Sequence, residues 1–204
     1  YYKICKAMFV CGGPYETNAG FEDKYGSDFT KAKQLLAEGG YDGTPVVLLH
    51  STDLYVLTNM APIAKALMEK AGLKVDMQSM DWQTLVARRA KKEAPDKGGW
   101  NVLITSTSSV DSLDPVNSSF ISASCDKAWF GWPCDEEITR LRQAFADETD
   151  EGKRKELVEK IQLRAAEVPT HAVLGQYTGA MGTRKNISGN VTSPVPVFWN
   201  VEKK

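Results

Sequence analysis

The sequence predicts an α/β fold with a mostly parallel sheet flanked by helices. Two observations lead to this prediction. Short apolar runs without alternation, which are typical of strands buried on both faces, take turns with segments whose apolar residues recur at helical spacing. The joints between them are short, so strand, helix and strand follow one another as βαβ units, which imply parallel pairing and a right-handed crossover.

Length and composition are those of an ordinary globular domain. The 204 residues are 42% hydrophobic and 25% charged, with a formal net charge of -1 and both signs interspersed. This balance predicts one domain, or one domain plus an appendage, and offers no basic patch for nucleic acid. The longest apolar runs fall far short of the roughly 18 residues that a membrane-spanning helix needs.

The two ends of the chain are predicted to be irregular. Residues 1–26 are rich in Gly, Pro and Asn and form an entry segment, while 185–204 form a turn-rich tail. The first residue is Tyr1, and no leader with a charged and an apolar region precedes the fold. We therefore expect the sequence to be a piece of a longer protein.

The first regular element is predicted as a helix over 29–38. Ser27 or Asp28 can cap its N-terminus, and the Gly39-Gly40 pair stops it. The residues of its expected apolar face are Ala32, Leu35 and Leu36.

A buried strand over 45–50, a helix over 55–71 and a strand over 73–80 form the first βαβ unit. Pro62 does not fit a helix interior, so this helix either starts near Asn59 or bends at the proline.

The next elements extend the same pattern. Asp81 caps a helix over 82–92, and a third strand follows over 100–105. The stretch 106–133 is the longest without periodicity, and such segments in a compact domain are usually functional or disordered. Its aromatic residues argue against disorder.

Two helices and a strand complete the predicted fold. The helices cover 135–146 and 151–167, and the acidic start of the first suits the positive end of a helix dipole. Pro169 ends the second helix, and the strand covers 170–180.

The four cysteines form two local pairs, Cys5 with Cys11 and Cys125 with Cys134. Their spacings differ from those of zinc ligands, and the two histidines stand alone. Of the three connectivities that four cysteines allow, we favour the two local disulfides, which need an oxidising compartment. Buried free thiols in a cytosolic protein are the alternative that the spacing leaves open.

Motifs for catalysis are absent from the sequence, including the nucleophile elbow, the zinc-protease helix and the phosphate-binding loop. Asp111 and Asp114 lie in a Ser- and Pro-containing loop, where they fit Asx turns better than a glycosidase pair. We predict no catalytic residue, no metal site and no cofactor. The alternative is a hydrolase or transferase domain, which would need His50 or His171 beside a nucleophile or an acid.

The candidate binding residues follow the predicted third strand. Ligands of parallel α/β sheets bind beyond the carboxyl ends of the strands. At that end the sequence places a carboxylate among hydroxyls, which suits an ammonium or a hydroxyl-rich ligand. Two tryptophans further along offer flat apolar surface to a ligand, unless they only fill the core. The candidate ligand-binding residues are Ser108, Ser109, Asp111, Asn117, Trp129 and Trp132.

Several segments resemble the family 5 bacterial solute-binding proteins, the dipeptide and oligopeptide type. Each corresponds to a helix, strand or loop of that family, and their order and spacing along nearly the whole chain make the resemblance specific. Residues 111–115 resemble the loop that reads D-x-x-D-P in many members. The other segments that carry the resemblance are 28–41, 66–75, 80–82, 135–141, 156–162, 175–177 and 184–186.

The resemblance implies an architecture and a location. Members of this family are more than twice this length, and they close two lobes on a ligand that they deliver to an ABC transporter permease. Residues 1–204 would then be a periplasmic-binding-protein-like lobe, the C-terminal ligand-binding lobe, without most of the N-terminal one. The implied location is the periplasm of a Gram-negative bacterium, with a signal peptide on the precursor, which supports both disulfides. A monomer is expected.

The resemblance also implies a role for Asp111. In peptide-binding members the first Asp of the D-x-x-D-P loop holds the ammonium group of the ligand, and such a pair is strong when hydrogen bonds satisfy both groups. The Gly-Trp that often precedes this Asp is replaced here by Thr107-Ser108, so the pocket is more polar or has a smaller apolar part. A small peptide is the first expectation, and nickel complexes, haem, sugars and opines are alternatives within the family.

Overall fold

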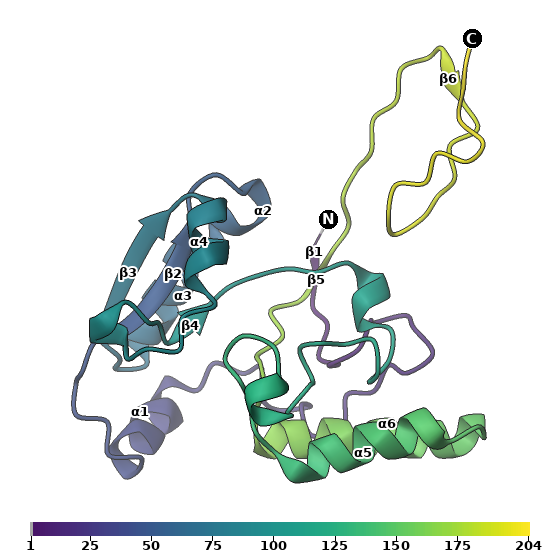
Figure 1. The fold of residues 1–204 in the computed structure, drawn as a ribbon. Helices are drawn as coiled ribbons and strands as arrows, with labels where there is room; N and C mark the ends of the chain where they lie inside the picture. The colour runs from purple at the N-terminus through teal and green to yellow at the C-terminus, as the bar shows by residue number, and fades with distance from the viewer. Residues whose placement is uncertain (1) are drawn as a thin grey trace. The chain divides into compact units, whose positions relative to one another are not determined.

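The computed structural model describes residues 2–204, and the chain divides into two compact units (Figure 1). Residues 26–106 form one unit, called the α/β unit here. Residues 2–25 and 107–204 form the other, called the helical unit. The sequence predicted one domain, with or without an appendage. In the structure the α/β unit is instead inserted, along the chain, between the two parts of the helical unit.

The α/β unit is built on a parallel three-stranded sheet. Its central strand is β2 (Val46–Ser51), which lies between β3 (Val75–Met80) and β4 (Val102–Leu103). Both neighbours run parallel to β2, with Val46 opposite Val75 and Leu48 opposite Val102. Residues 47–51 are all buried, so the strand predicted over 45–50 is confirmed.

Apolar side chains cover both faces of this sheet, as a parallel sheet requires. Around Leu48, one cluster gathers Leu57, Ala61 and Ile104. Around Val47 and Leu49, the other gathers Leu85 together with partly buried aromatic residues. The alternation of β2 side chains between the two clusters fixes its register, because a slip by one residue would exchange the faces.

The helices of the α/β unit are α1 (Phe29–Glu38), α2 (Tyr55–Thr58), α3 (Met60–Lys70) and α4 (Trp82–Arg88). Asp28 caps α1 by accepting from the Lys31 amide at 2.9 Å, and the predicted bounds of this helix are confirmed. Of its expected apolar face, Ala32 and Leu36 are half-buried, whereas Leu35 is 53% exposed, and no residue of α1 is fully buried.

The helix predicted over 55–71 is divided ahead of Pro62, which is the first of the two predicted alternatives, a helix that starts near Asn59. The chain forms α2, turns at Asn59 and starts α3 at Met60. Pro62 is therefore the third residue of α3, where the missing amide hydrogen has no acceptor in the helix.

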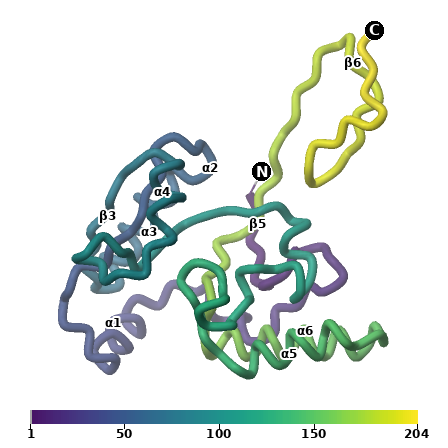
Figure 2. Tube along the Cα trace, viewed as in Figure 1, coloured from purple at the N-terminus to yellow at the C-terminus, as the bar shows by residue number. Residues whose placement is uncertain are grey.

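In the helical unit, α5 (Glu136–Asp147) and α6 (Glu151–Glu167) pack against each other, and the N-terminal segment runs beside them (Figure 2). The core of the unit includes Phe9 from that segment, Phe145 from α5 and Ile161 from α6. An ion pair also joins the helices, since Arg164 Nη2 lies 2.7 Å from Asp135 Oδ2. The hydrogen bond from Arg164 lowers the pKa of Asp135.

Three predicted elements are shorter than expected. The helix over 82–92 ends at Arg88, and the strand over 100–105 retains only β4. The strand over 170–180 retains only β5 (Gln176–Tyr177), because its one partner is the two-residue strand β1 (Tyr2–Lys3), which pairs with it antiparallel. A strand extends only as far as its partner provides hydrogen bonds.

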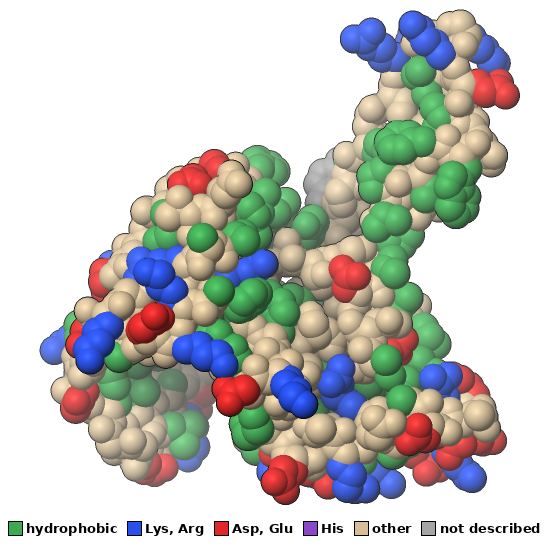
Figure 3. Space-filling model, in the orientation of Figure 1, with side chains coloured by type: hydrophobic (Ala, Val, Ile, Leu, Met, Phe, Trp, Pro, Cys, Tyr) green, Lys and Arg blue, Asp and Glu red, His purple; other side chains and the backbone are tan. Residues whose placement is uncertain are grey.

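The last residues of the chain are less irregular than predicted. β6 (Ile187–Ser188) pairs antiparallel with β7 (Glu202–Lys203). Between them, Phe198 and Trp199 are 73% and 87% exposed. Figure 3 shows hydrophobic side chains gathered on this C-terminal segment, whereas acidic and basic side chains are interspersed over α5 and α6.

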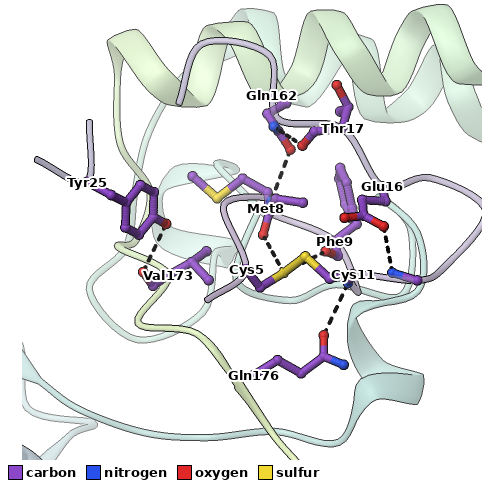
Figure 4. The surroundings of a disulfide bond; sticks show 12 residues. Cys5, Met8, Phe9, Cys11, Glu16, Thr17, Tyr25, Gln162, Val173 and Gln176 are labelled. Atoms are coloured by element: carbon purple, nitrogen blue, oxygen red, sulfur yellow. Dashed lines mark hydrogen bonds between the residues drawn. A yellow bond between two sulfur atoms is a disulfide. The ribbon is translucent and has the colours of Figure 1, made fainter. Parts of the chain in front are cut away.

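The structure contains the two local disulfides, Cys5–Cys11 and Cys125–Cys134. Cys5 and Cys11 are buried and form a small cluster with Ala7. In Figure 4 the Cys11 amide donates to Gln176 Oε1, at 3.1 Å, which ties the disulfide to the segment that carries β5.

Candidate functional site

The first candidate residues form a tight turn after β4. Ser109–Ser112 make the 3-10 helix η2, and Ser108 caps it by accepting from the Val110 amide at 3.4 Å. The turn belongs to the helical unit, where the Val10 amide donates to the carbonyl oxygen of Ser112 at 3.1 Å. Ser108 and Ser109 thus shape the turn on which Asp111 stands.

The Asp111 carboxylate is exposed on this turn. It accepts a hydrogen bond from the Thr107 hydroxyl, with 2.7 Å between Oγ1 and Oδ2. Within residues 2–204 no ion pair of this carboxylate is found, and an ammonium group of a ligand could complete the arrangement.

Asp114, three residues later, has a structural task. Its carboxylate accepts from the backbone amides of Val116 and Asn117 at 2.8 and 2.9 Å, and from Asn117 Nδ2 at 2.7 Å. This geometry confirms the predicted Asx turn for Asp114. It does not do so for Asp111, whose carboxylate is bonded to a hydroxyl.

A hollow of about 430 Å³ lies in the helical unit and brings three of the six candidates together. Asn117, Trp129 and Trp132 line it, whereas Ser108, Ser109 and Asp111 do not. Its remaining wall residues come from the loop 116–130 and from α5. They are Val116, Ser119, Ser122, Lys127, Ala128, Phe130 and Arg142.

The aromatic wall of the hollow is a chain of edge-to-face contacts. The ring centroids of Trp129 and Phe130 lie 5.1 Å apart, and those of Phe130 and Trp132 lie 6.5 Å apart. Behind them, Phe120 packs edge-on against Trp129 at 4.8 Å. Edge-to-face ring pairs contribute more stabilising free energy than the burial of their apolar area alone. The rings of the wall are therefore held in a defined geometry.

The loop that carries this wall is closed at its neck. Cys125 is bonded to Cys134, and Ser124 and Cys134 form an isolated antiparallel bridge. Trp132 has φ of 48°, in the left-handed region that a bulky side chain rarely adopts. A residue keeps such a conformation only where its surroundings fix it, and strain of this kind is concentrated at functional sites.

Two cations share the hollow with the aromatic residues. Arg142 on α5 donates through Nε to the carbonyl oxygen of Pro115 at 2.8 Å, and through Nη2 to those of Val116 and Ser118 at 3.4 Å. Burial lowers the pKa of Arg142, and the charge of Asp114 opposes this shift. Lys127 is the second cation of the wall and is exposed.

Sequence reasoning did not single out Lys127 or Arg142. Arg142 looks like an ordinary polar position of an amphipathic helix, and only the tertiary structure directs it to the loop after Asp114. Arg142 therefore supports the wall by holding three loop carbonyls, and Lys127 adds a charge at its exposed edge.

Each histidine lies beside a hydroxyl, as the hydrolase alternative needs, but neither lines the hollow. His50 belongs to the sheet, where Nε2 donates to the Thr58 carbonyl oxygen and Nδ1 faces Ser79 Oγ, both at 2.9 Å. The pair is a cross-strand contact, since His50 lies opposite Ser79 in register. His171 contacts the Thr170 hydroxyl and packs against Phe120, and burial lowers its pKa to about 4. None of these residues lines the hollow.

Metal-binding clusters and membrane spans are not found in the described part of the chain. Among residues 2–204, no three His, Cys, Asp or Glu side chains are grouped so that they could hold a metal ion. No helix in the same range combines the length and the apolar character that crossing a bilayer takes.

Comparisons with known proteins agree on one family. Residues 7–130 match the family model described as bacterial extracellular solute-binding proteins, family 5 Middle. The whole chain is 30% identical, over 205 residues, to a protein of Sinorhizobium fredii named "Probable peptide ABC transporter periplasmic-binding protein". The chain spans 38% of the length of that relative.

Solved structures share the fold. The ABC transporter substrate-binding protein CtaP of Listeria monocytogenes matches with a TM-score of 0.68 and 20% identity, over 82% of this chain and 33% of that one. A dipeptide-binding protein of Pseudoalteromonas sp., in complex with Met-Leu, matches with a TM-score of 0.61 and 22% identity, over 86% of this chain and 35% of that one. The predicted α/β, periplasmic-binding-protein-like fold is confirmed.

Proposed function

The chain belongs to the bacterial extracellular solute-binding proteins of family 5, and from that membership we propose that the whole protein binds a small solute, in the first instance a peptide, and delivers it to an ABC transporter permease. The named relative is a peptide-type binding protein, which supports a peptide over other solutes. The proposed location is the periplasm of a Gram-negative bacterium, with the protein acting as a monomer.

Within that protein we propose that this chain is one ligand-binding lobe, the C-terminal one. The first two of the following facts support a part of the whole protein and the third supports its location, while the C-terminal position follows from the resemblance of the sequence segments alone. The family match covers residues 7–130. The chain spans 38% of the related protein. The two disulfides suit an oxidising compartment outside the cytoplasm.

The aromatic hollow is the observation that carries this proposal. Its volume of about 430 Å³ falls within the range of small-molecule sites, which combine apolar walls with a few polar groups. The rings of Trp129 and Trp132 would pack on apolar or planar parts of a solute, and Asn117 would bond its polar groups. Asp111 would anchor an ammonium group from its own turn.

Native mass spectrometry of the full-length protein, purified without added ligand, tests the proposal. We expect a complex whose excess mass corresponds to a short peptide, because binding proteins of high affinity retain solute during purification. A retained sugar, opine, haem or nickel complex would overturn the peptide assignment but keep the binding function. A protein that retains nothing and binds none of a panel of these solutes would overturn both.

A further inference from the structure

Thr107 and Asp111 bring a hydroxyl and a carboxylate together where the chain re-enters the helical unit. Both residues are exposed, and Thr107 Oγ1 lies 2.7 Å from Asp111 Oδ2. Because the two residues are only four positions apart, the turn between them creates this pair, without a contact from elsewhere in the chain. The hydroxyl oxygen and the carboxylate therefore stand side by side on one exposed turn.

Backbone hydrogen bonds hold the turn that carries this pair. The Asp111 amide donates to the carbonyl oxygen of Ser108 at 3.0 Å. At the end of the turn, the carbonyl oxygen of Ser112 accepts from the Val10 amide at 3.1 Å. Neither bond involves the Thr107 side chain, so the turn is fixed without its hydroxyl, and the hydroxyl acts on the Asp111 carboxylate.

The direction of the hydrogen bond decides what the pair can bind. An ionised carboxylate only accepts, so Thr107 must supply the hydrogen to Asp111. A hydroxyl has a single hydrogen, and once that hydrogen is given to the carboxylate, the oxygen of Thr107 can only accept from a ligand. The pair therefore presents acceptors alone. An ammonium group is its chemical complement, because it has three N–H donors and no acceptor.

We propose that Thr107 determines specificity, because its hydroxyl oxygen accepts a second hydrogen bond from a primary ammonium group that Asp111 holds. Asp111 alone attracts any cation, whereas the added acceptor favours cations with several N–H donors. The preferred solutes therefore carry an unsubstituted amino group. In the peptide binders that the sequence resembles, a glycine often stands at the position of Thr107, so the resemblance does not supply this acceptor. The inference rests on the proposed function in one respect, namely that this turn faces the solute.

Two small cations test the acceptor pair in the full-length protein, stripped of retained solute. In mildly acidic buffer, glycinamide has an ammonium group with three N–H donors, and 2-(dimethylamino)acetamide has the same charge and skeleton with one N–H donor. Binding is followed by the backbone amide resonance of Asp111, assigned with the Asp111→Asn variant. We expect glycinamide to shift this resonance with a Kd about tenfold lower than that of the dimethylated probe, the size of one hydrogen bond from a charged donor.

Variants at Thr107 separate the hydroxyl from the turn. Thr107→Val keeps the shape of the side chain and removes the hydroxyl, so glycinamide should bind about fivefold to tenfold more weakly. The dimethylated probe should bind as before, because its one N–H goes to Asp111. Thr107→Ser keeps the hydroxyl and should keep the preference for glycinamide. Thr149→Val, at an exposed position between α5 and α6, is the matched control and should bind both probes like wild type.

The inference is overturned if neither probe shifts the Asp111 resonance, if Thr107→Val keeps the preference of wild type, or if Thr107→Ser loses it. Equal weakening of both probes in Thr107→Val would also overturn it, because the hydroxyl would then only orient Asp111. These results are independent of the native mass spectrum. A retained peptide together with an unchanged preference in Thr107→Val would refute only the acceptor pair. A preference that depends on Thr107, in a protein that binds no solute of the panel, would refute only the proposed function.

Discussion

Gln162 joins three parts of the helical unit although its side chain is completely buried. Its Oε1 accepts from the Met8 amide at 3.0 Å, and its Nε2 donates to the Thr17 carbonyl oxygen (Figure 4). Nε2 also donates to the carbonyl oxygen of Ala19. The N-terminal segment has almost no regular structure of its own, so this one residue of α6 satisfies backbone groups that would otherwise be buried without partners.

We therefore expect Gln162→Leu to destabilise the protein strongly. The substitution keeps most of the volume but leaves a backbone donor and two acceptors unpaired, which costs about 2–4 kcal/mol of unfolding free energy. Urea denaturation measures this cost. Gln143→Leu, at an exposed position of α5, is the matched control and should change stability by less than about 0.5 kcal/mol. Equal effects would show that the bonds of Gln162 contribute nothing.

Asp111 tests the proposed ammonium site. Its carboxylate is exposed and, among residues 2–204, is bonded to the Thr107 hydroxyl alone, so Asp111→Asn should leave folding intact. In the full-length protein it should weaken binding of a peptide with a free amino terminus about tenfold. The same peptide with an acetylated amino terminus should bind both proteins alike. Unchanged affinity for the free peptide would make Asp111 a turn residue only.

His171 makes stability depend on pH. Its pKa falls from 6.5 to about 4 in the folded protein, mainly because burial disfavours the charged ring, while a hydrogen bond with the Phe120 backbone opposes the shift. Between these values the unfolded chain binds more protons than the folded one, so stability is lost as pH falls from 6.5 towards 4. Urea titrations at pH 7, 5.5 and 4.5 should show a smaller loss for His171→Asn than for wild type. Equal losses would refute the assignment.

Residue roles were predictable only where they are local. The caps Asp28 and Asp81 and the turn at Asp114 follow from neighbours in sequence, and all three accept backbone hydrogen bonds as such residues do. Asp135, predicted as the first residue of its helix, is instead the cap of α5. Gln162 and Arg142 act on segments far away along the chain. No local pattern marks such residues, because their partners are chosen by tertiary packing.

At the scale of elements, the loop 125–134 determines the shape of the hollow. Five of its residues line the hollow, including both tryptophan candidates. Backbone bonds from Cys125 to the Pro133 carbonyl and from Trp132 to that of Trp129 hold the loop from inside. The disulfide closes the same neck covalently, so it fixes the loop before a ligand arrives.

The two disulfides should therefore differ in their effect on binding. The Cys5→Ser/Cys11→Ser and Cys125→Ser/Cys134→Ser variants each open a short loop and should lose about 2–3 kcal/mol of stability. In the full-length protein only the second pair of substitutions should also weaken solute binding, several-fold, because it releases the aromatic wall. Calorimetric titration with the retained solute measures this effect. Equal affinities in both variants would show that the wall keeps its shape without the bond.

The helices followed from the sequence better than the strands did. The helix over 151–167 has the predicted bounds, since an aspartate cap and a closing proline act locally. Strands β4 and β5 are much shorter than predicted, because their length depends on partners that apolar runs do not reveal. At Gly175, φ is 135° and an added Cβ would come within 2.9 Å of the Lys3 carbonyl oxygen. The glycine that permits β1 to pair there also interrupts the predicted strand.

At the scale of the whole molecule, the chain passes from one unit to the other after residues 25 and 106. A signal for both boundaries was present in the sequence, in Gly26-Ser27 and in the Ser- and Thr-rich run 105–109. These two segments could not be recognised as unit boundaries from the sequence, because similar loops also occur inside domains. The order of the helices and strands in the sequence was enough to indicate the family. That the chain returns to the helical unit at residue 107 became known only from the structure.

The central claim is that the aromatic hollow of this chain holds the solute of the whole protein. Calorimetric titration of the full-length protein with the solute that it retains tests the claim directly. Trp129→Ala should weaken binding about tenfold or more, because the ring is a flat contact surface at the centre of the wall. Leu163→Ala, at an exposed position of α6 outside the hollow, should bind like wild type. Equal affinity in all three proteins would contradict the claim.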